Sequence, residues 1–123
     1  MTEKPQIDAP EGPAPDDLVI TDITVGDGDL AEAGKQVSVH YVGVTHSTGE
    51  EFDASYNRGA PLEFPLGVGM VIKGWEQGIE GMRVGGRRQL VIPPHLAYGE
   101  RGAGGVIGPG ETLIFVCDLM GVK

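Results

Sequence analysis

The residues with the most chemical potential in this chain are its aromatic side chains, which are few and unevenly placed. Only seven of the 123 residues are aromatic, and one of them is the single tryptophan, Trp75. Five others each end or interrupt an apolar run: Tyr41, Phe52, Phe64, Tyr98 and Phe115. Rings gathered beside turns are typical of the walls of a concave ligand site. Packing in the hydrophobic core is the competing interpretation, because aromatic side chains are often buried there.

Residues that commonly carry covalent or metal chemistry are not arranged for it. The histidines His40, His46 and His95 lie far apart, with no cysteine or carboxylate at a spacing that suggests a metal site. Cys117 follows Phe115 by two residues on one predicted strand face, which indicates a core position and not a nucleophile. No glycine-rich stretch has the Gly-Lys-Ser/Thr ending of a phosphate-binding loop. An enzyme with this sequence would have to work without a nucleophile, a metal or a cofactor.

Rotation about an X-Pro amide is a reaction that needs none of these groups. Its barrier of roughly 18–20 kcal/mol arises because resonance gives the C–N bond double-bond character. Water stabilises the planar, polar ground state more than the twisted transition state. An apolar pocket that removes this water, and holds the twisted amide by a few hydrogen bonds, therefore accelerates the rotation by differential binding.

Short strands and one short helix are predicted to position the rings. Residues 37–41 alternate apolar with polar side chains, so the odd-numbered residues share one face of a strand. Trp75, Ile79 and Met82 are spaced as one face of a helix over 75–82, which its two internal glycines weaken. Further strands are predicted at 18–25, 51–53, 62–64, 88–92 and 112–120. The expected fold is α+β, with an antiparallel, curled β-sheet of about five strands wrapped over one short α-helix.

Composition restricts the class of protein and its partners. The net charge of −9 argues against nucleic acid or an anionic membrane as the main partner. The nearest approach to a basic cluster is Arg83, Arg87 and Arg88, which we interpret as a solvated strand end. A single cysteine fits a reducing compartment, and the first residues lack a signal pattern, so a cytoplasmic location is expected.

Residues 1–17 contain four prolines and few apolar side chains, which predicts a disordered acidic arm before a domain at 18–123.

Several motifs in a fixed order resemble one family over residues 18–123. They are Val-His-Tyr-Val-Gly at 39–43, Phe-Asp-Ala-Ser at 52–55, Phe-Pro-Leu-Gly at 64–67, Val-Ile-Lys-Gly-Trp-Glu at 71–76, Gly-Met-Arg-Val-Gly at 81–85, Ile-Pro-Pro at 92–94, Ala-Tyr-Gly at 97–99 and Thr-Leu-Ile-Phe at 112–115. In order and spacing they resemble the FKBP family of peptidyl-prolyl cis-trans isomerases. The resemblance implies an isomerase that uses no cofactor or metal, acts as a monomer, and binds proline-containing polypeptides and macrolides of the rapamycin type.

The same resemblance implies roles for eleven residues. Trp75 would be the floor under the proline ring, while the Tyr98 hydroxyl and the Ile72 backbone N–H would donate hydrogen bonds to bound carbonyls. Asp53 would face the ligand from the rim, with Arg58 as the partner of its charge. Tyr98, Asp53, Trp75 and Phe115 form the expected catalytic set. The remaining contacts to substrate would come from Tyr41, Phe52, Leu62, Val71 and Ile72 around the pocket and from Ile107 as its cover.

Four positions depart from the family pattern. Ala103 replaces a histidine that many members carry in the loop over the pocket, and Leu62 replaces a frequent aromatic residue at the rim. Met70 stands where an acidic residue is frequent, although family ligands use the backbone carbonyl there. Gly-Pro-Gly at 108–110 replaces a turn richer in proline. The leading hypothesis is an isomerase, and the alternative is a binding module for proline peptides or macrolides whose turnover is incidental. For Phe64, core packing is the better interpretation.

Overall fold

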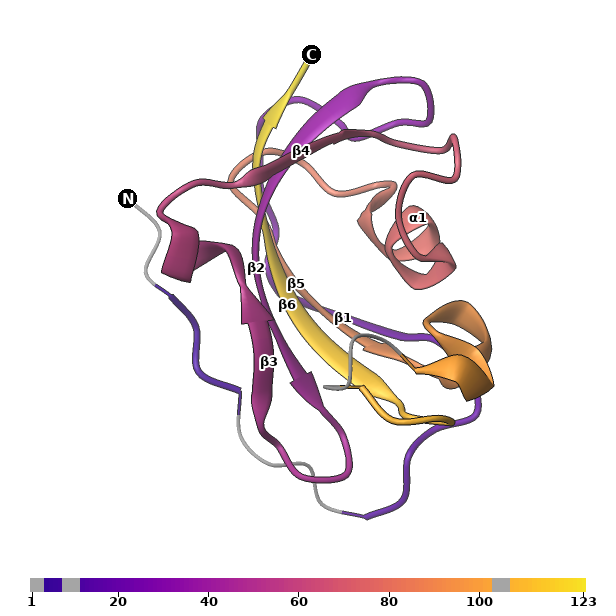
Figure 1. Ribbon diagram of the computed structural model, residues 1–123. Coiled ribbons are helices and arrows are strands. Elements are labelled where there is room, and N and C mark those ends of the chain that lie inside the picture. The colour runs from indigo at the N-terminus through magenta and orange to yellow at the C-terminus, as the bar shows by residue number, and fades with distance from the viewer. Residues whose placement is uncertain (1–3, 8–11, 103–106) are drawn as a thin grey trace.

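The computed structural model describes residues 4–7, 12–102 and 107–123, and its strands form one antiparallel sheet. The strands are β1 (Val19–Thr24), β2 (Gln36–Thr45), β3 (Glu51–Ala54), β4 (Leu62–Pro65), β5 (Arg87–Ile92) and β6 (Leu113–Val122). Their order is β1-β5-β6-β2-β3, and β4 pairs with β2 outside this path. Figure 1 shows the sheet curling around the single α-helix, α1 (Lys73–Ile79). The α+β fold is confirmed, with six strands where about five were expected.

Strand β2 organises the sheet because it pairs with three other strands. It runs antiparallel to β6 along nearly its whole length. On its other side, its first half pairs with β4, where Val39 lies opposite Leu62. Its second half pairs with β3, where Gly43 lies opposite Asp53. Residues of β3 and β4 therefore reach the same concavity although a 3₁₀ helix, η1 (Ser55–Arg58), separates them in sequence.

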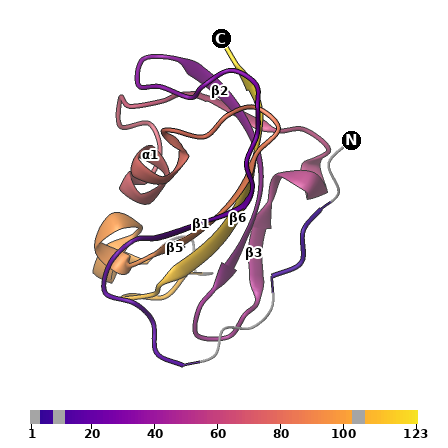
Figure 2. The same cartoon turned by 180° about the vertical axis from the view of Figure 1, so that it is seen from behind.

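Helix α1 lies against the concave side of the sheet, in both the front view and the view from behind (Figures 1 and 2). The helix begins at Lys73 and ends at Ile79, so the predicted span 75–82 was shifted toward the C-terminus. It ends early because Glu80 is not helical and Gly81 has a positive φ of 93°. Trp75, Ile79 and Met82 are nevertheless all buried in one cluster, as their spacing predicted.

The glycines of α1 allow the helix to approach the sheet closely. A Cβ atom on Gly74 would lie 2.4 Å from a side-chain atom of Ile92, and one on Gly78 would lie 2.6 Å from Leu90. Glycine weakens an isolated helix. In this helix it permits contact between the helix backbone and β5, and burial of the helix against the sheet offsets the weak propensity.

The two faces of the sheet hold two apolar clusters. The larger lies between the sheet and α1 and includes the predicted core face of β2, with Val37, Val39 and Tyr41. Cys117 belongs to it and is fully buried, as expected. Phe64 is also in it, with 4 % of its surface exposed, so its interpretation as a core residue is confirmed. Val42, Val44, Ala54 and Ile114 form the smaller cluster on the opposite, outer face.

The arginines at the start of β5 differ from the prediction of a solvated strand end. Arg87 forms an ion pair with Asp118, with Nε 2.7 Å from Oδ1. Arg88 pairs with Asp22 at 2.6 Å and donates to the carbonyl oxygen of Gly78 at 2.8 Å. The prediction was wrong for Arg87 and Arg88 because the register of β5 places each opposite or beside an acidic residue of a neighbouring strand.

Two further 3₁₀ helices, η2 (Pro94–Leu96) and η3 (Gly99–Arg101), follow β5 and carry the chain past the open end of the concavity. In the described residues, we find no helix long and apolar enough to cross a lipid bilayer.

Candidate active site

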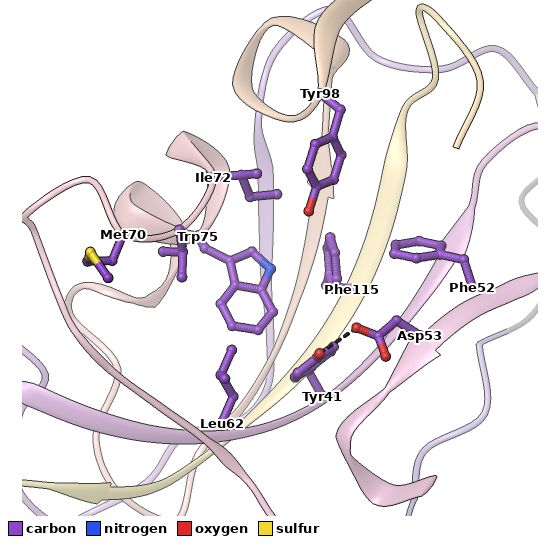
Figure 3. A pocket seen from close by; sticks show the side chains of 10 residues that line it. Tyr41, Phe52, Asp53, Leu62, Met70, Ile72, Trp75, Tyr98 and Phe115 are labelled. Atoms are coloured by element: carbon purple, nitrogen blue, oxygen red, sulfur yellow. Dashed lines mark hydrogen bonds between the residues drawn. The ribbon is translucent and has the colours of Figure 1, made fainter. Parts of the chain in front are cut away.

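A cavity of about 390 Å³ opens between the sheet and the N-terminal end of α1. This volume lies within the range of roughly 300–1,000 Å³ that small-ligand pockets occupy. The lining residues come from β2, β3, β4, β6, α1 and two loops: Tyr41, Phe52, Asp53, Leu62, Met70, Val71, Ile72, Trp75, Tyr98 and Phe115. Figure 3 shows their side chains surrounding a common space.

Trp75 forms the floor of the cavity and is held by rings on several sides. Its ring centroid is 4.9 Å from that of Tyr41 and 5.3 Å from that of Phe115, both in edge-to-face orientation. Phe64 supports it from the core at 5.7 Å. Among the residues that the structure describes, the indole Nε1 of Trp75 is the one buried side-chain nitrogen or oxygen without a hydrogen-bond partner. The floor is therefore rigid and apolar, with a single N–H group still unsatisfied.

Gly43 is required behind the aromatic wall. A Cβ atom at this position would lie 2.7 Å from ring atoms of both Phe52 and Phe115. These two rings meet edge-to-face with their centroids 5.5 Å apart. Without a side chain on Gly43, β2 passes directly beneath both rings, which can then turn their surfaces toward the cavity.

One side of the cavity is polar and carries three linked groups. The hydroxyl of Tyr41 donates to Oδ2 of Asp53 at 2.5 Å, and Arg58 donates to Oδ1 of Asp53 at 2.7 Å. Arg58 also donates to the hydroxyl oxygen of Tyr41 at 2.7 Å. Arg58 is thus the partner of Asp53 that the sequence predicted, and this triangle fixes the carboxylate at the rim.

The triangle also sets the protonation states of its members. Partial burial alone would raise the pKa of Asp53, but the hydrogen bonds from Tyr41 and Arg58 outweigh it and hold the pKa below its usual range. Burial, reinforced by the hydrogen bond to Asp53, raises the pKa of Tyr41 to about 12. At neutral pH the carboxylate is ionised and the phenol is protonated.

Two donors remain available to a ligand. Figure 3 shows the side chain of Tyr98, which comes from the turn before η3, directing its hydroxyl into the cavity. Burial raises the pKa of Tyr98, and the negative charge of Asp53 adds to the effect, so the hydroxyl keeps its proton. The backbone N–H of Ile72 stands just before α1, and no acceptor for it is found in the described parts of the chain.

Glu76 holds the loop that supplies one wall of the cavity. Its carboxylate accepts hydrogen bonds from the backbone N–H of Gly67 at 2.5 Å and of Gly69 at 2.9 Å. Both glycines have a positive φ, 87° and 79°. The loop leads directly to Met70, Val71 and Ile72, so a side chain on α1 determines where these wall residues lie. The sequence did not predict this role, because Glu76 was recognised only as the last residue of the motif at 71–76.

The structure brings together nine of the eleven residues predicted for the site, as lining residues of one cavity. Arg58 stands behind this lining and acts on it through Asp53 and Tyr41. Ile107 is not among the described lining residues; it is 6 % exposed and packs in the larger core cluster. Met70 lines the cavity and was not among the eleven residues, although the resemblance had already implied a ligand contact to its backbone carbonyl. Ala103 lies outside the described residues.

Cys117 and the three histidines are not among the residues that line the cavity. Burial raises the pKa of Cys117 far above its usual range, and the residue lies in the core away from the cavity lining. No group of three or more histidine, cysteine and acidic residues that could hold a metal ion occurs in the described ranges. The cavity itself offers an apolar floor with the unsatisfied indole N–H of Trp75, the two donors of Tyr98 and Ile72, and one fixed carboxylate.

Comparisons with known proteins agree with this geometry. Residues 28–120 match the family described as FKBP-type peptidyl-prolyl cis-trans isomerase. An FK506-binding protein of Streptomyces anulatus is 69 % identical over 121 residues, which cover 98 % of each chain. A probable FK506-binding protein of Corynebacterium glutamicum is 58 % identical over 118 residues, covering 96 % of this chain and 98 % of the relative. The crystal structure of AtFKBP13 superimposes with a TM-score of 0.79 at 46 % identity, covering 86 % of this chain and 93 % of that one.

Proposed function

This chain belongs to the FKBP-type peptidyl-prolyl cis-trans isomerase family, and on that premise we propose that the cavity over Trp75 binds an X-Pro amide and accelerates its rotation. The observation that carries the proposal is the floor itself. Trp75 is 4 % exposed, is fixed edge-to-face by Tyr41 and Phe115, and lines the cavity with its flat indole ring.

Removal of water from the amide is the main source of acceleration. The planar amide loses more hydration than the twisted amide when both enter an apolar pocket, so the barrier of roughly 18–20 kcal/mol falls. The rings of Phe52, Phe115 and Tyr41, with Val71, exclude water around the proline. No proton is transferred and no covalent bond forms.

Hydrogen bonds then favour the twisted geometry and orient the chain. The Ile72 N–H and the Tyr98 hydroxyl donate to substrate carbonyl oxygens on either side of the proline. Asp53 is ionised and faces the rim, where it attracts the partial positive charge on the carbonyl carbon of the rotating amide. A donor or charge aimed at the transition state is worth more in a site without water.

Substrates are extended or flexible proline-containing polypeptides, and the protein assists their folding in the cytoplasm as a monomer. Support comes from the cavity mouth, where Leu62, Met70 and Tyr98 are exposed and leave room for a chain to pass. The domain spans residues 18–123. The proteins from Streptomyces and Corynebacterium are named for binding FK506, and the same cavity takes a macrolide of that type in competition with peptide.

An isomerisation assay coupled to a protease distinguishes the proposed catalysis from the rival function, which is a binding module with incidental turnover. With the full chain and short X-Pro peptides, we expect catalysis that a macrolide inhibits competitively. The apolar rim and Asp53 should make Leu-Pro a better substrate than Glu-Pro by several-fold. Macrolide binding seen by Trp75 fluorescence, without turnover of any peptide, would support the binding module instead. Equal rates for Leu-Pro and Glu-Pro would contradict the description of the rim.

A further inference from the structure

The outer face of the sheet carries an apolar patch behind the wall that holds Asp53. Alternation along β2 sends Tyr41 into the cavity and Val42 and Val44 to the opposite face. There they pack with Ala54 of β3 and Ile114 of β6, and all four are at most 4 % exposed. The surface on this side would expose the cluster unless another segment covered it, because β3 is short and lies at the edge of the sheet.

Residues 4–7 of the arm supply cover for this patch. Ile7 is partly buried and packs against the cluster, beside Tyr56 and Val91. Figure 1 shows this part of the arm running along the outside of β3, on the side away from α1. Within residues 4–7, Ile7 is the large aliphatic side chain and therefore the one best suited to an apolar contact.

Lys4 fixes the other end of the segment. Its ammonium lies 3.0 Å from Oε1 of Glu51 and donates to Oδ1 of Asn57 at 3.0 Å. Asn57 in turn donates to Oε2 of Glu51 at 3.0 Å. The three groups form a closed triangle that joins the arm to β3 and to η1. Glu51 and Asn57 flank the segment that contains Asp53.

The spacing of the segment suits this position. Pro5 favours an extended backbone between Lys4 and Ile7, which places their Cα atoms about 9 Å apart at roughly 3.1 Å per residue. Residues three apart in β3 are separated by a similar distance, about 10 Å. Proline also reduces the entropy that the arm loses on docking, because its φ is already restricted. It has no N–H to donate, so the arm can cover the edge strand without extending the sheet.

We propose that the outer face of the sheet is a docking site for the chain's own segment Lys4–Ile7, and that the docked segment holds β3 and η1 so that Asp53 and Arg58 stay in place at the cavity. The ligand is an extended peptide with a cation three residues before a branched apolar side chain. The docking is independent of the catalytic assignment, whereas its effect on turnover rests on the proposed function.

Two observations favour the chain's own arm as the occupant. Only four residues separate Ile7 from the point at residue 12 where the described chain resumes and runs below the sheet to β1 at the opposite edge, so a short connection within one chain joins the segment to the domain (Figure 1). The match with the Streptomyces protein takes in 121 of the 123 residues and so includes nearly all of the arm. That relative therefore carries a segment of comparable length before its domain.

Hydrogen exchange and methyl NMR on the full chain test the docking directly. In Ile7→Ser, we expect the amides of 51–58 to exchange about three- to tenfold faster and the methyl resonances of Val42, Val44 and Ile114 to shift. Gln6→Ser changes an exposed residue of the same segment, and Ile23→Ser changes an exposed isoleucine of β1; both controls should resemble the parent chain. Exchange rates and methyl shifts unchanged in Ile7→Ser would overturn the docking site.

A charge exchange tests the polar anchor and the occupant. Lys4→Glu should loosen 51–58 as Ile7→Ser does, and the double variant with Glu51→Lys should restore protection. Failure of the double variant to recover would overturn the role of this ion pair. Protection that falls on dilution would assign the segment to a second copy and overturn docking within one chain.

Catalysis gives the last readout. Ile7→Ser should lower kcat/KM about two- to fivefold, through the placement of Asp53, with the same drop in the Lys4→Glu variant. If both variants lose protection at 51–58 while kcat/KM is unchanged, the arm docks but does not position the site, and that half of the proposal is wrong. If the parent chain shows no turnover at all, the proposed function fails while the exchange data still decide the docking.

Discussion

The two faces of the sheet differ in how completely their polar groups are satisfied. On the outer face, Asp118 accepts from Arg87 and from the hydroxyl of Tyr56, although it is only 4 % exposed. On the concave face, the Trp75 Nε1 is buried without a partner among the described residues, and the Ile72 N–H has no acceptor there. Buried polar groups normally find partners. The face left incomplete is the one where a ligand can complete it.

The outer network also supports the cavity from behind. Ser55 is fully buried and lies 2.7 Å from His40 Nδ1, and its Oγ accepts from the backbone N–H of Tyr41 at 2.7 Å. His40 stacks on Tyr56 with 4.3 Å between ring centroids. Tyr41 is therefore fixed through its backbone on one face while its hydroxyl serves the other. The outer face therefore contributes mainly to stability and the concave face mainly to catalysis, so substitutions on each face should change these two measurements to different extents.

The largest effect should come from breaking the outer network. Asp118→Ala removes the acceptor for Tyr56 and for two hydrogen bonds from Arg87. Breaking a fully buried ion pair costs about 3–5 kcal/mol, and because 24 % of the Arg87 side chain is exposed, the loss here should lie at or below the lower end of that range. Urea unfolding should show that loss, with kcat/KM per folded molecule within about threefold of the parent. Asp118→Asn, which keeps the size and an acceptor, should lose less. A large drop in kcat/KM with stability unchanged would reverse the assignment of the two faces.

A smaller effect, on activity alone, should follow from Tyr98→Phe on the concave face. The change removes one donor to a substrate carbonyl, and a net hydrogen bond contributes roughly 0.5–1.5 kcal/mol. Since about 1.4 kcal/mol corresponds to a tenfold change in rate, kcat/KM should fall about tenfold or less. The urea midpoint should stay close to that of the parent, because Tyr98 is 39 % exposed. Complete loss of turnover in a folded variant would mean that Tyr98 acts as an essential chemical group.

The smallest effect should be that of pH on turnover. The pKa of Asp53 is lowered and those of Tyr41 and Tyr98 are raised, so none of the three changes its charge near neutrality. We expect kcat/KM to be flat between about pH 5 and about pH 9, with a substrate that does not titrate there. A bell-shaped profile centred near neutrality would indicate proton transfer and contradict catalysis by desolvation.

The same shifts give the direction of the pH dependence of stability. The folded pKa of Asp53 is depressed, so its contribution is present above the unfolded pKa and is lost as pH falls through the folded value. The folded pKa of Tyr41 is raised from 10.0 to about 12, so its contribution is present below pH 10.0 and is lost as pH rises toward about 12. Stability measured by urea at several pH values should therefore decline at both extremes.

The sequence predicted the concave face well and the outer face poorly. Nine of the eleven expected residues line one cavity, because order and spacing of the motifs identify positions on strands whose inward faces are apolar. The pairing of Asp53 with Arg58 was also predicted, through the family resemblance, and the two residues are only five apart in the chain. These are relations that a local pattern contains.

Relations between distant strands were not accessible. Asp118 and Arg87 are 31 residues apart and meet because β5 and β6 pair in one particular register, which alternation does not specify. The same holds for Arg88 with Asp22, at 66 residues. Glu76 reaches back to Gly67 and Gly69 only because both glycines turn their N–H groups toward α1. The disorder predicted for residues 1–17 stays a prediction. In the described part of this arm, Lys4 and Ile7 contact the domain.

Synthesis on the ribosome delivers β6 last among the strands, although β6 lies between β5 and β2 in the middle of the sheet. Within the described chain, β6 alone joins the pair β1 and β5 to the group β2, β3 and β4. The partial sheet of β1 and β5 and the partial sheet of β2, β3 and β4 therefore stay unpaired, with their apolar faces uncovered, until β6 has emerged from the exit tunnel as far as residue 122. Because the pairing of β2 with β6 joins residues far apart in sequence, folding should be slow, in the range of milliseconds to seconds. During this interval the uncovered apolar faces of both partial sheets are open to contact with other chains, so the order of the strands makes aggregation before β6 pairs the main hazard of folding.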